Sequence, residues 1–76
     1  MTNIDLQTFL LRHLSNMPPS SGETASGLAQ LIGRQPGSES DRAHSAWIRA
    51  NLMQMEREGK VKRMDDQYPI VWQVKR

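Results

Sequence analysis

A helix-forming segment from about residue 40 to 58 is followed at once by a glycine and two short apolar segments, and this order constrains the fold more than any other feature. Ile48, Leu52 and Met55 recur at helical spacing within the first segment. Gly59 ends the pattern, and the segments VKRM and PIVWQV follow, separated by DDQY. Two apolar segments joined by turn-forming residues are typical of an antiparallel hairpin. The C-terminal half therefore predicts a long helix that leads directly into a hairpin.

The N-terminal residues predict a first helix over residues 3–16. Asn3 is its expected N-cap, and Asp5 lies in the first turn, where the helix dipole favours a negative charge. Pro18 and Pro19 end the helix, because the residue before a proline avoids the helical region. The apolar residues at helical spacing, and hence the expected buried stripe, are Leu6, Phe9, Leu10, Leu14 and Met17.

A second, shorter helix is predicted after Thr24, which is the expected N-cap, with Gly33 as the C-cap. The polar segment RQPGSESD then predicts a loop in which Ser38 or Ser40 caps the third helix. The residues expected on the buried face of the second helix are Ala25, Leu28, Leu31 and Ile32.

The hairpin is predicted to begin at Val61 and to turn at Asp65-Asp66-Gln67. In the returning strand Ile70, Trp72 and Val74 are expected to face the helices, alternating with Val71, Gln73 and Lys75. In the third helix His44 and Asn51 are expected near the edges of the core stripe. With 76 residues the chain is long enough for one domain, so we expect a single α+β domain over residues 1–76.

The composition narrows the class of protein. No cysteine is present, which excludes a disulfide framework and a cysteine-based zinc site. No apolar run approaches the roughly 18 residues of a membrane span, and the N-terminus lacks the layout of a signal peptide. We therefore expect a soluble cytoplasmic protein without a membrane partner.

No arrangement of residues predicts catalysis or a bound cofactor. His13 and His44 lack the neighbouring ligands that a metal site requires. Glu56 and Glu58 point in different directions on a helix, and the two adjacent aspartates form a turn signal. We expect that the protein is not an enzyme and has no cofactor.

Charge is distributed unevenly along the chain. Residues 1–41 contain two basic and four acidic residues, a net charge of −2, whereas residues 42–76 contain eight basic and four acidic residues, a net charge of +4. A polarised domain of this kind suggests that its C-terminal part meets a polyanion.

The outward side of the third helix carries a row of basic residues. Arginine binds guanine or phosphate, and basic side chains on a hairpin suit phosphates. The alternative interpretation is a solvated helix face with pairs such as Glu56–Lys60, and basic side chains that protect a strand edge. The candidate DNA-binding residues are Arg42, Ser45, Arg49, Met53, Arg57, Lys60, Lys62 and Arg63.

The two tryptophans have different expected roles. Trp72 is expected in the core, because a small domain needs its large side chains inside. Trp47 lies at the margin of the core stripe, so it either covers the preceding loop or contributes to a partner surface.

Three helices followed by a hairpin resemble the winged helix-turn-helix family. The phrase TASGLAQLIG resembles the second helix of that family, IRANLMQMEREGKVKR resembles its recognition helix entering the wing, and YPIVWQV resembles its returning wing strand. Within the family, the length and layout look most like the small stand-alone regulators of fimbrial operons. The resemblance implies double-stranded DNA as the partner, with the third helix in the major groove and the wing on the neighbouring backbone.

The chain departs from the family pattern between Gly33 and Ile48, where it has about nine residues more than the usual tight turn. It also resembles the Z-DNA-binding winged helices, because PIVW is similar to their proline-then-tryptophan wing. Alignment on Gly59 and Lys60 puts Arg49 where that subfamily has an asparagine and Met53 where it has a tyrosine. In the subfamily these two positions carry contacts to left-handed DNA.

Two hypotheses follow from the sequence. The first is a small transcriptional regulator of a bacterium, plasmid or phage that binds DNA, sequence-specifically or generally, through the third helix and a basic wing. The second is a protein-interaction module on the same scaffold that docks a partner protein through Trp47 and the loop of residues 34–41. Neither hypothesis defines the oligomeric state.

Overall fold

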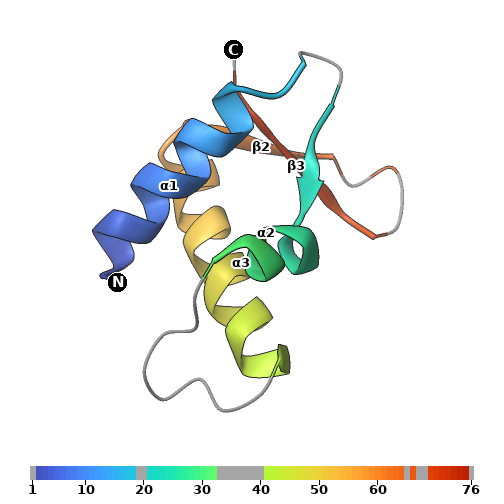
Figure 1. Cartoon of the computed structure of the whole chain (residues 1–76). Coiled ribbons are helices and arrows are strands. Elements are labelled where there is room, and N and C mark those ends of the chain that lie inside the picture. Colours follow the sequence, from blue (N-terminus) through green and yellow to red (C-terminus); the bar gives the residue numbers. More distant parts are fainter. Residues whose placement is uncertain (1, 19–20, 33–40, 65, 67–68, 76) are drawn as a thin grey trace.

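The computed structural model describes residues 2–18, 21–32, 41–64, 66 and 69–75. In the described part of the chain, three helices and three short strands form an α+β domain (Figure 1). The elements, in chain order, are α1 (Asn3–Ser15), β1 (Glu23–Thr24), α2 (Ala25–Leu31), α3 (Asp41–Arg57), β2 (Val61–Met64) and β3 (Val71–Val74). The predicted fold class, three helices and a C-terminal antiparallel hairpin, is confirmed.

The core lies where the three helices meet the sheet, and α1 packs against β3 while α3 packs against β2. The predicted stripe of α3 is confirmed, as is the burial of Trp72, which is 2% exposed. Phe9 and Met17 are partly buried at the margin of this core. Its fully buried side chains are Leu6, Leu10, Leu14, Leu28, Ile48, Leu52, Met55 and Val61.

The start of α1 differs from the prediction, because Thr2 rather than Asn3 is the N-cap. The Thr2 hydroxyl accepts from the Asp5 backbone N–H (3.1 Å), and the Asp5 carboxylate accepts from the Thr2 N–H (3.3 Å). This reciprocal capping box satisfies two N–H groups at the helix terminus. The bond from the Thr2 backbone also lowers the pKa of Asp5. The Asn3 side chain is thereby left to contact α3.

Helix α2 begins as predicted, with the Thr24 hydroxyl accepting from the Gly27 N–H at 3.0 Å. The prediction that Leu31 is buried is wrong, because its side chain is 54% exposed and Ala29 is buried instead. The inward face is centred between Leu28 and Ala29, and about 100° per residue turns Leu31 away from it. The predicted caps Gly33, Ser38 and Ser40 lie outside the described residues.

The sheet has a third strand that the sequence did not predict. β3 is central, and it pairs antiparallel with β2 on one side and with β1 on the other. A Cβ atom at Gly22 would lie 2.5 Å from the Trp72 carbonyl oxygen, so the lack of a side chain lets this segment approach β3. Gln73, which alternates with Trp72 and Val74 along β3, is also buried.

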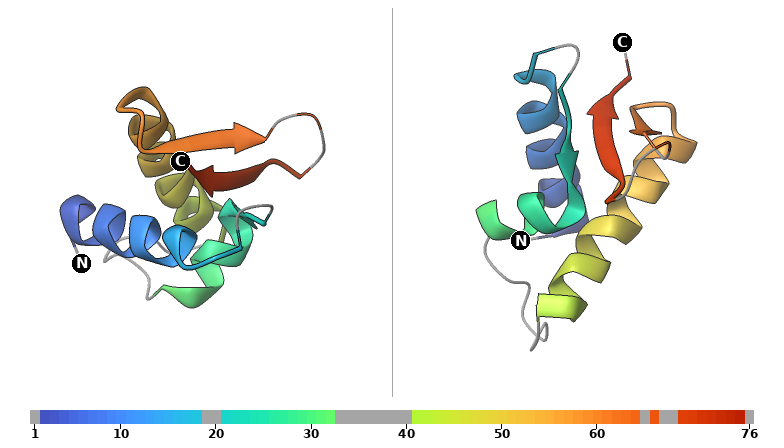
Figure 2. Two further views of the ribbon diagram at one scale, coloured as in Figure 1. Left: turned by 90° about the horizontal axis from the view of Figure 1, so that it is seen from above. Right: turned by 90° about the vertical axis from the view of Figure 1, so that its right-hand side faces the viewer.

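A Schellman motif joins α3 to the wing formed by β2 and β3. Gly59 has a φ of +77°, and the Lys60 N–H donates to the Met55 carbonyl at 2.9 Å. The Gly59 N–H donates to the Glu56 carbonyl at 3.0 Å. β2 therefore leaves the C-terminal end of α3 directly, and β3 runs back beside it (Figure 2). The predicted helix stop at Gly59 is confirmed, while the expected turn lies largely outside the described residues.

We expect Gly59→Ala to lower the free energy of unfolding by about 1–2 kcal/mol, because an L-residue is strained in the left-handed region. No atom lies within 4 Å of the added Cβ, so the loss reports backbone strain and not a clash. Gly59→Asn is the matched control, since asparagine tolerates this conformation better. Urea denaturation measures both variants, and equal losses would contradict the explanation.

Candidate nucleic-acid interface

His44 joins the N-terminal half of α3 to the end of α2. Its Nε2 lies 2.9 Å from the Ala29 carbonyl oxygen and 3.2 Å from that of Ile32, and its side chain is buried. These carbonyls belong to the end of α2, where helical carbonyls lack partners within the helix. Two acceptors at this distance assign the proton to Nε2, which donates to both. The sequence placed His44 at the edge of the core; the structure gives it a buried joining role.

A second set of hydrogen bonds joins the middle of α3 to the start of α1. The Trp47 Nε1–H donates to Asn3 Oδ1 at 2.9 Å, and the buried Asn51 amide donates to the Trp47 carbonyl at 3.0 Å. Gln7 Nε2 donates to Asn51 Oδ1 at 2.9 Å. Trp47 is partly buried against the core. Its predicted role of covering the loop that precedes α3 concerns residues outside the described ranges.

With α3 held from both sides, its outward face is directed to solvent and to the wing. Arg42, Arg49 and Arg57 are exposed along it, and Met53 is 39% exposed. A cavity of about 250 Å³ lies between this face, the start of α2 and the wing. Its lining residues are Thr24, Ala25, Ser26, Arg49, Met53, Arg63, Pro69, Ile70 and Trp72. The cavity lining therefore combines apolar side chains, such as Met53 and Trp72, with two arginines, Arg49 and Arg63.

Arg63 is engaged by two neighbours in the free protein. Its Nε lies 3.5 Å from Glu56 Oε2, and its Cζ lies 5.8 Å from the centroid of the Trp72 ring. That separation is within the range of a cation–π contact. The Glu56–Lys60 pair of the alternative interpretation does not form. Glu56 contacts Arg63 of the wing, and Lys60 pairs with Glu58 at 3.5 Å.

Several basic side chains carry charge that is not neutralised locally. Among the described residues, no acidic group forms an ion pair with Arg42, Arg49, Arg57 or Lys62. All four are exposed. Arg49 combines this free charge with a place at the cavity wall, which makes it the most available cation of that site.

The candidate residues do not form one cluster. Arg49, Met53 and Arg63 meet at the cavity. Arg42 lies at the N-terminal end of α3, with the partly buried Ser45 one turn later, whereas Arg57 and Lys60 lie at its other end. Lys62 is exposed on the opposite face of β2 from Arg63, because successive strand side chains alternate.

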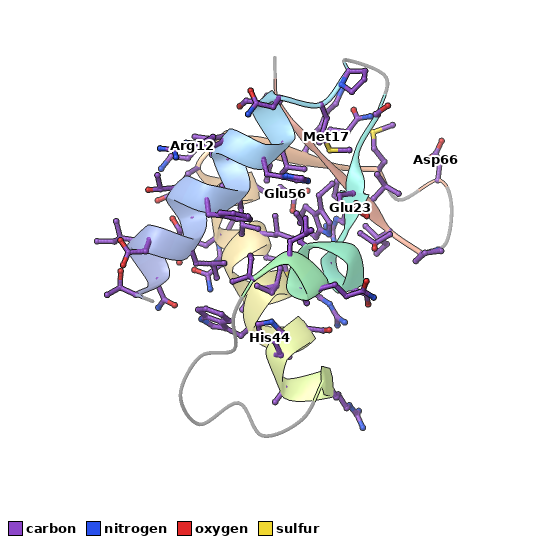
Figure 3. The ribbon with its side chains drawn as sticks, viewed as in Figure 1. Arg12, Met17, Glu23, His44, Glu56 and Asp66 are labelled. Atoms are coloured by element: carbon purple, nitrogen blue, oxygen red, sulfur yellow. The ribbon has the colours of Figure 1, made fainter. Side chains whose placement is uncertain are left out.

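Sequence reasoning missed the contribution of α2 and of the wing's apolar residues to this site. Thr24 and Ser26 line the cavity from the start of α2, and Pro69 and Ile70 line it from the wing. The sequence PIVW, residues 69–72, was the signal that could have identified the lining residues of the wing. Figure 3 labels Glu56 on α3 and Glu23 on β1; Arg12 on α1 and Asp66 lie on opposite sides of the view.

Within the described ranges, no three or more histidines, cysteines or carboxylates are grouped in a way that could hold a metal ion. A search of the described helices for a segment both long enough and apolar enough to cross a membrane found none.

The fold matches that of a solved structure. The crystal structure of a viral Zalpha domain bound to left-handed Z-DNA superposes with a TM-score of 0.74 at 14% sequence identity, covering 97% of this chain and 91% of that one. Neither a protein-family model nor a curated protein sequence matches the chain. The chain therefore has a winged-helix fold, in which β2 and β3 form the wing.

We expect His44→Phe to lower the free energy of unfolding by about 1–3 kcal/mol, because two carbonyls at the end of α2 lose their buried donor. His13→Phe is the matched control. His13 is only partly buried and stacks on Phe9 at 6.1 Å, so we expect a change within about 0.5 kcal/mol. Thermal unfolding of both variants measures the difference, and an unchanged midpoint for His44→Phe would contradict the joining role.

Proposed function

We propose that this chain is a small DNA-binding transcriptional regulator that contacts double-stranded DNA through α3 and the wing. The observation that carries the proposal is the cavity between these elements, where Arg49 has no ion-pair partner among the described residues and a second guanidinium, Arg63, is close by. Basic groups that converge beside an exposed helix suit a phosphate backbone.

The dimensions of α3 support the same function. Its 17 residues span about 26 Å, and an α-helix fits the major groove of B-form DNA. Arg42 and Arg49 lie on its outward side and are available to base edges or phosphates, whereas Lys62 and Arg63 extend the positive surface onto the wing. A duplex held by α3 and the wing would neutralise several phosphates at once.

The conformation of the bound DNA is a separate question that the fold does not answer, since fold does not imply function. The Zalpha domain of similar fold was crystallised with left-handed DNA. This chain has Arg49 and Met53 at the aligned positions where the Z-DNA-binding subfamily has asparagine and tyrosine. We therefore propose right-handed duplex DNA as the ligand, with left-handed DNA as the competing outcome of the test.

We expect the chain to bind a mixed-sequence duplex with an affinity that falls steeply with salt. If about four phosphates are neutralised, the slope of log K against log salt is about −3.6. Fluorescence anisotropy at several salt concentrations measures it, with an alternating d(CG) duplex held in the left-handed form as the comparison. Tighter binding to the left-handed duplex would reassign the ligand. Absence of binding even at low salt would favour the protein-interaction module that uses Trp47 and residues 34–41.

We expect Arg49→Ala to weaken duplex binding by about 1–3 kcal/mol if Arg49 contacts a base. Arg12→Ala is the matched control. Arg12 is an exposed arginine on α1 that does not line the cavity, and its replacement removes the same charge. Equal losses for the two variants would mean that net charge alone determines binding. Amide chemical-shift mapping of the labelled protein with the same duplex identifies the responding face.

A further inference from the structure

Glu56 is an acidic residue placed where the proposed interface is otherwise basic. It lies on α3 seven residues after Arg49, so nearly two helical turns bring it to the same side of the helix. Its side chain is 31% exposed and reaches Arg63 on the wing. Glu23, the other labelled glutamate of this region, is engaged elsewhere, since its carboxylate accepts from the Thr24 N–H at 2.9 Å (Figure 3).

The contact between Glu56 and Arg63 suits an exchangeable partner better than a structural one. The two charged groups are 3.5 Å apart, and both remain about one-third exposed to solvent. Ion pairs with this exposure contribute little to stability, because water screens them. The Trp72 ring holds the arginine on its other side and remains in place if the carboxylate is exchanged for another anion.

A DNA phosphate that approaches the wing would meet both groups. It would compete with Glu56 for the Arg63 guanidinium, and it would be repelled by the carboxylate at a separation shorter than the roughly 8 Å screening length. Each phosphate that gains a basic partner adds about 0.9 to the salt dependence of binding. While Glu56 holds Arg63, that increment is reduced.

We propose that Glu56 is a specificity-determining residue of the DNA interface: it occupies Arg63 in the free protein, competes with DNA phosphate for that guanidinium, and so limits sequence-independent binding. This inference rests on the proposed function and assigns a role to one side chain within it. A duplex whose groove contacts with α3 are favourable supplies the extra binding energy that displaces Glu56. A duplex without such contacts leaves Arg63 paired to Glu56.

The test is Glu56→Gln, which keeps the size of the side chain and removes its charge. We expect affinity for a mixed-sequence duplex to rise about 3- to 10-fold at low salt, with a slope steeper by about 0.9, and the gain to shrink as salt increases. Glu58→Gln is the matched control. Glu58 lies two residues after Glu56, and its replacement removes the same charge and likewise breaks an ion pair, the one with Lys60. Equal gains for both variants would overturn the inference in favour of net charge.

Two further measurements decide how Glu56 acts. In an Arg63→Ala background Glu56→Gln should give less than half of its gain, since the competed guanidinium is absent. In the wild-type protein the Arg63 Nε–Hε resonance should shift on addition of duplex, and this readout does not depend on any variant being folded. A wild type that binds DNA with no shift of that resonance, or with no gain from Glu56→Gln, would overturn the role of Glu56 and leave the proposed function standing. A wild type that binds no duplex at low salt would overturn both.

Discussion

The positive φ of Gly59 is the backbone constraint on which the geometry of the site depends. It closes α3 with a hydrogen bond from Lys60 to Met55, and it sends the chain into β2 without an intervening loop. Val61 then enters the core as the first residue of the strand, and two residues later Arg63 lies opposite Trp72 in the sheet. A turn of different geometry would move the wing relative to α3, so the cavity and the Glu56–Arg63 contact both follow from this one residue.

Helix α3 is fixed by polar contacts as well as by its apolar stripe. His44 joins it to α2 at one end of the inward face, and Asn51 and Trp47 join it to α1 through Gln7 and Asn3. Hydrophobic burial is non-directional and would tolerate rotation of the helix about its axis. These hydrogen bonds are directional and do not tolerate it, because rotation would separate donors from acceptors. These contacts therefore determine which residues face outward, among them Arg49.

The sequence predicted those parts of the fold that periodicity and glycine control. The stripe of α3 and the hairpin strands followed from apolar patterns of four or more residues, and the end of α3 followed from Gly59. β1 has only two residues, which is too short to show a period, and its place depends on the close approach of Gly22 to β3. The burial of Gln73 follows from that unpredicted neighbour. At the site, the outward arginines were predictable, but the Arg63–Glu56 contact joins two elements whose packing no local pattern specifies.

The likeness to a Z-DNA-bound Zalpha domain concerns the fold, whereas ligand recognition depends on the side chains of this chain. At 14% identity the likeness establishes the winged-helix fold alone, whereas the cavity between helix and wing is a feature of this chain's own structure. What such a cavity recognises depends on the side chains that line it. In this chain they include Met53, Arg63 in contact with an indole ring and a carboxylate, and Arg49, which has no ion-pair partner among the described residues. If the proposed DNA binding is correct, Arg49 would be available to a phosphate at first contact, whereas Arg63 would first have to exchange Glu56.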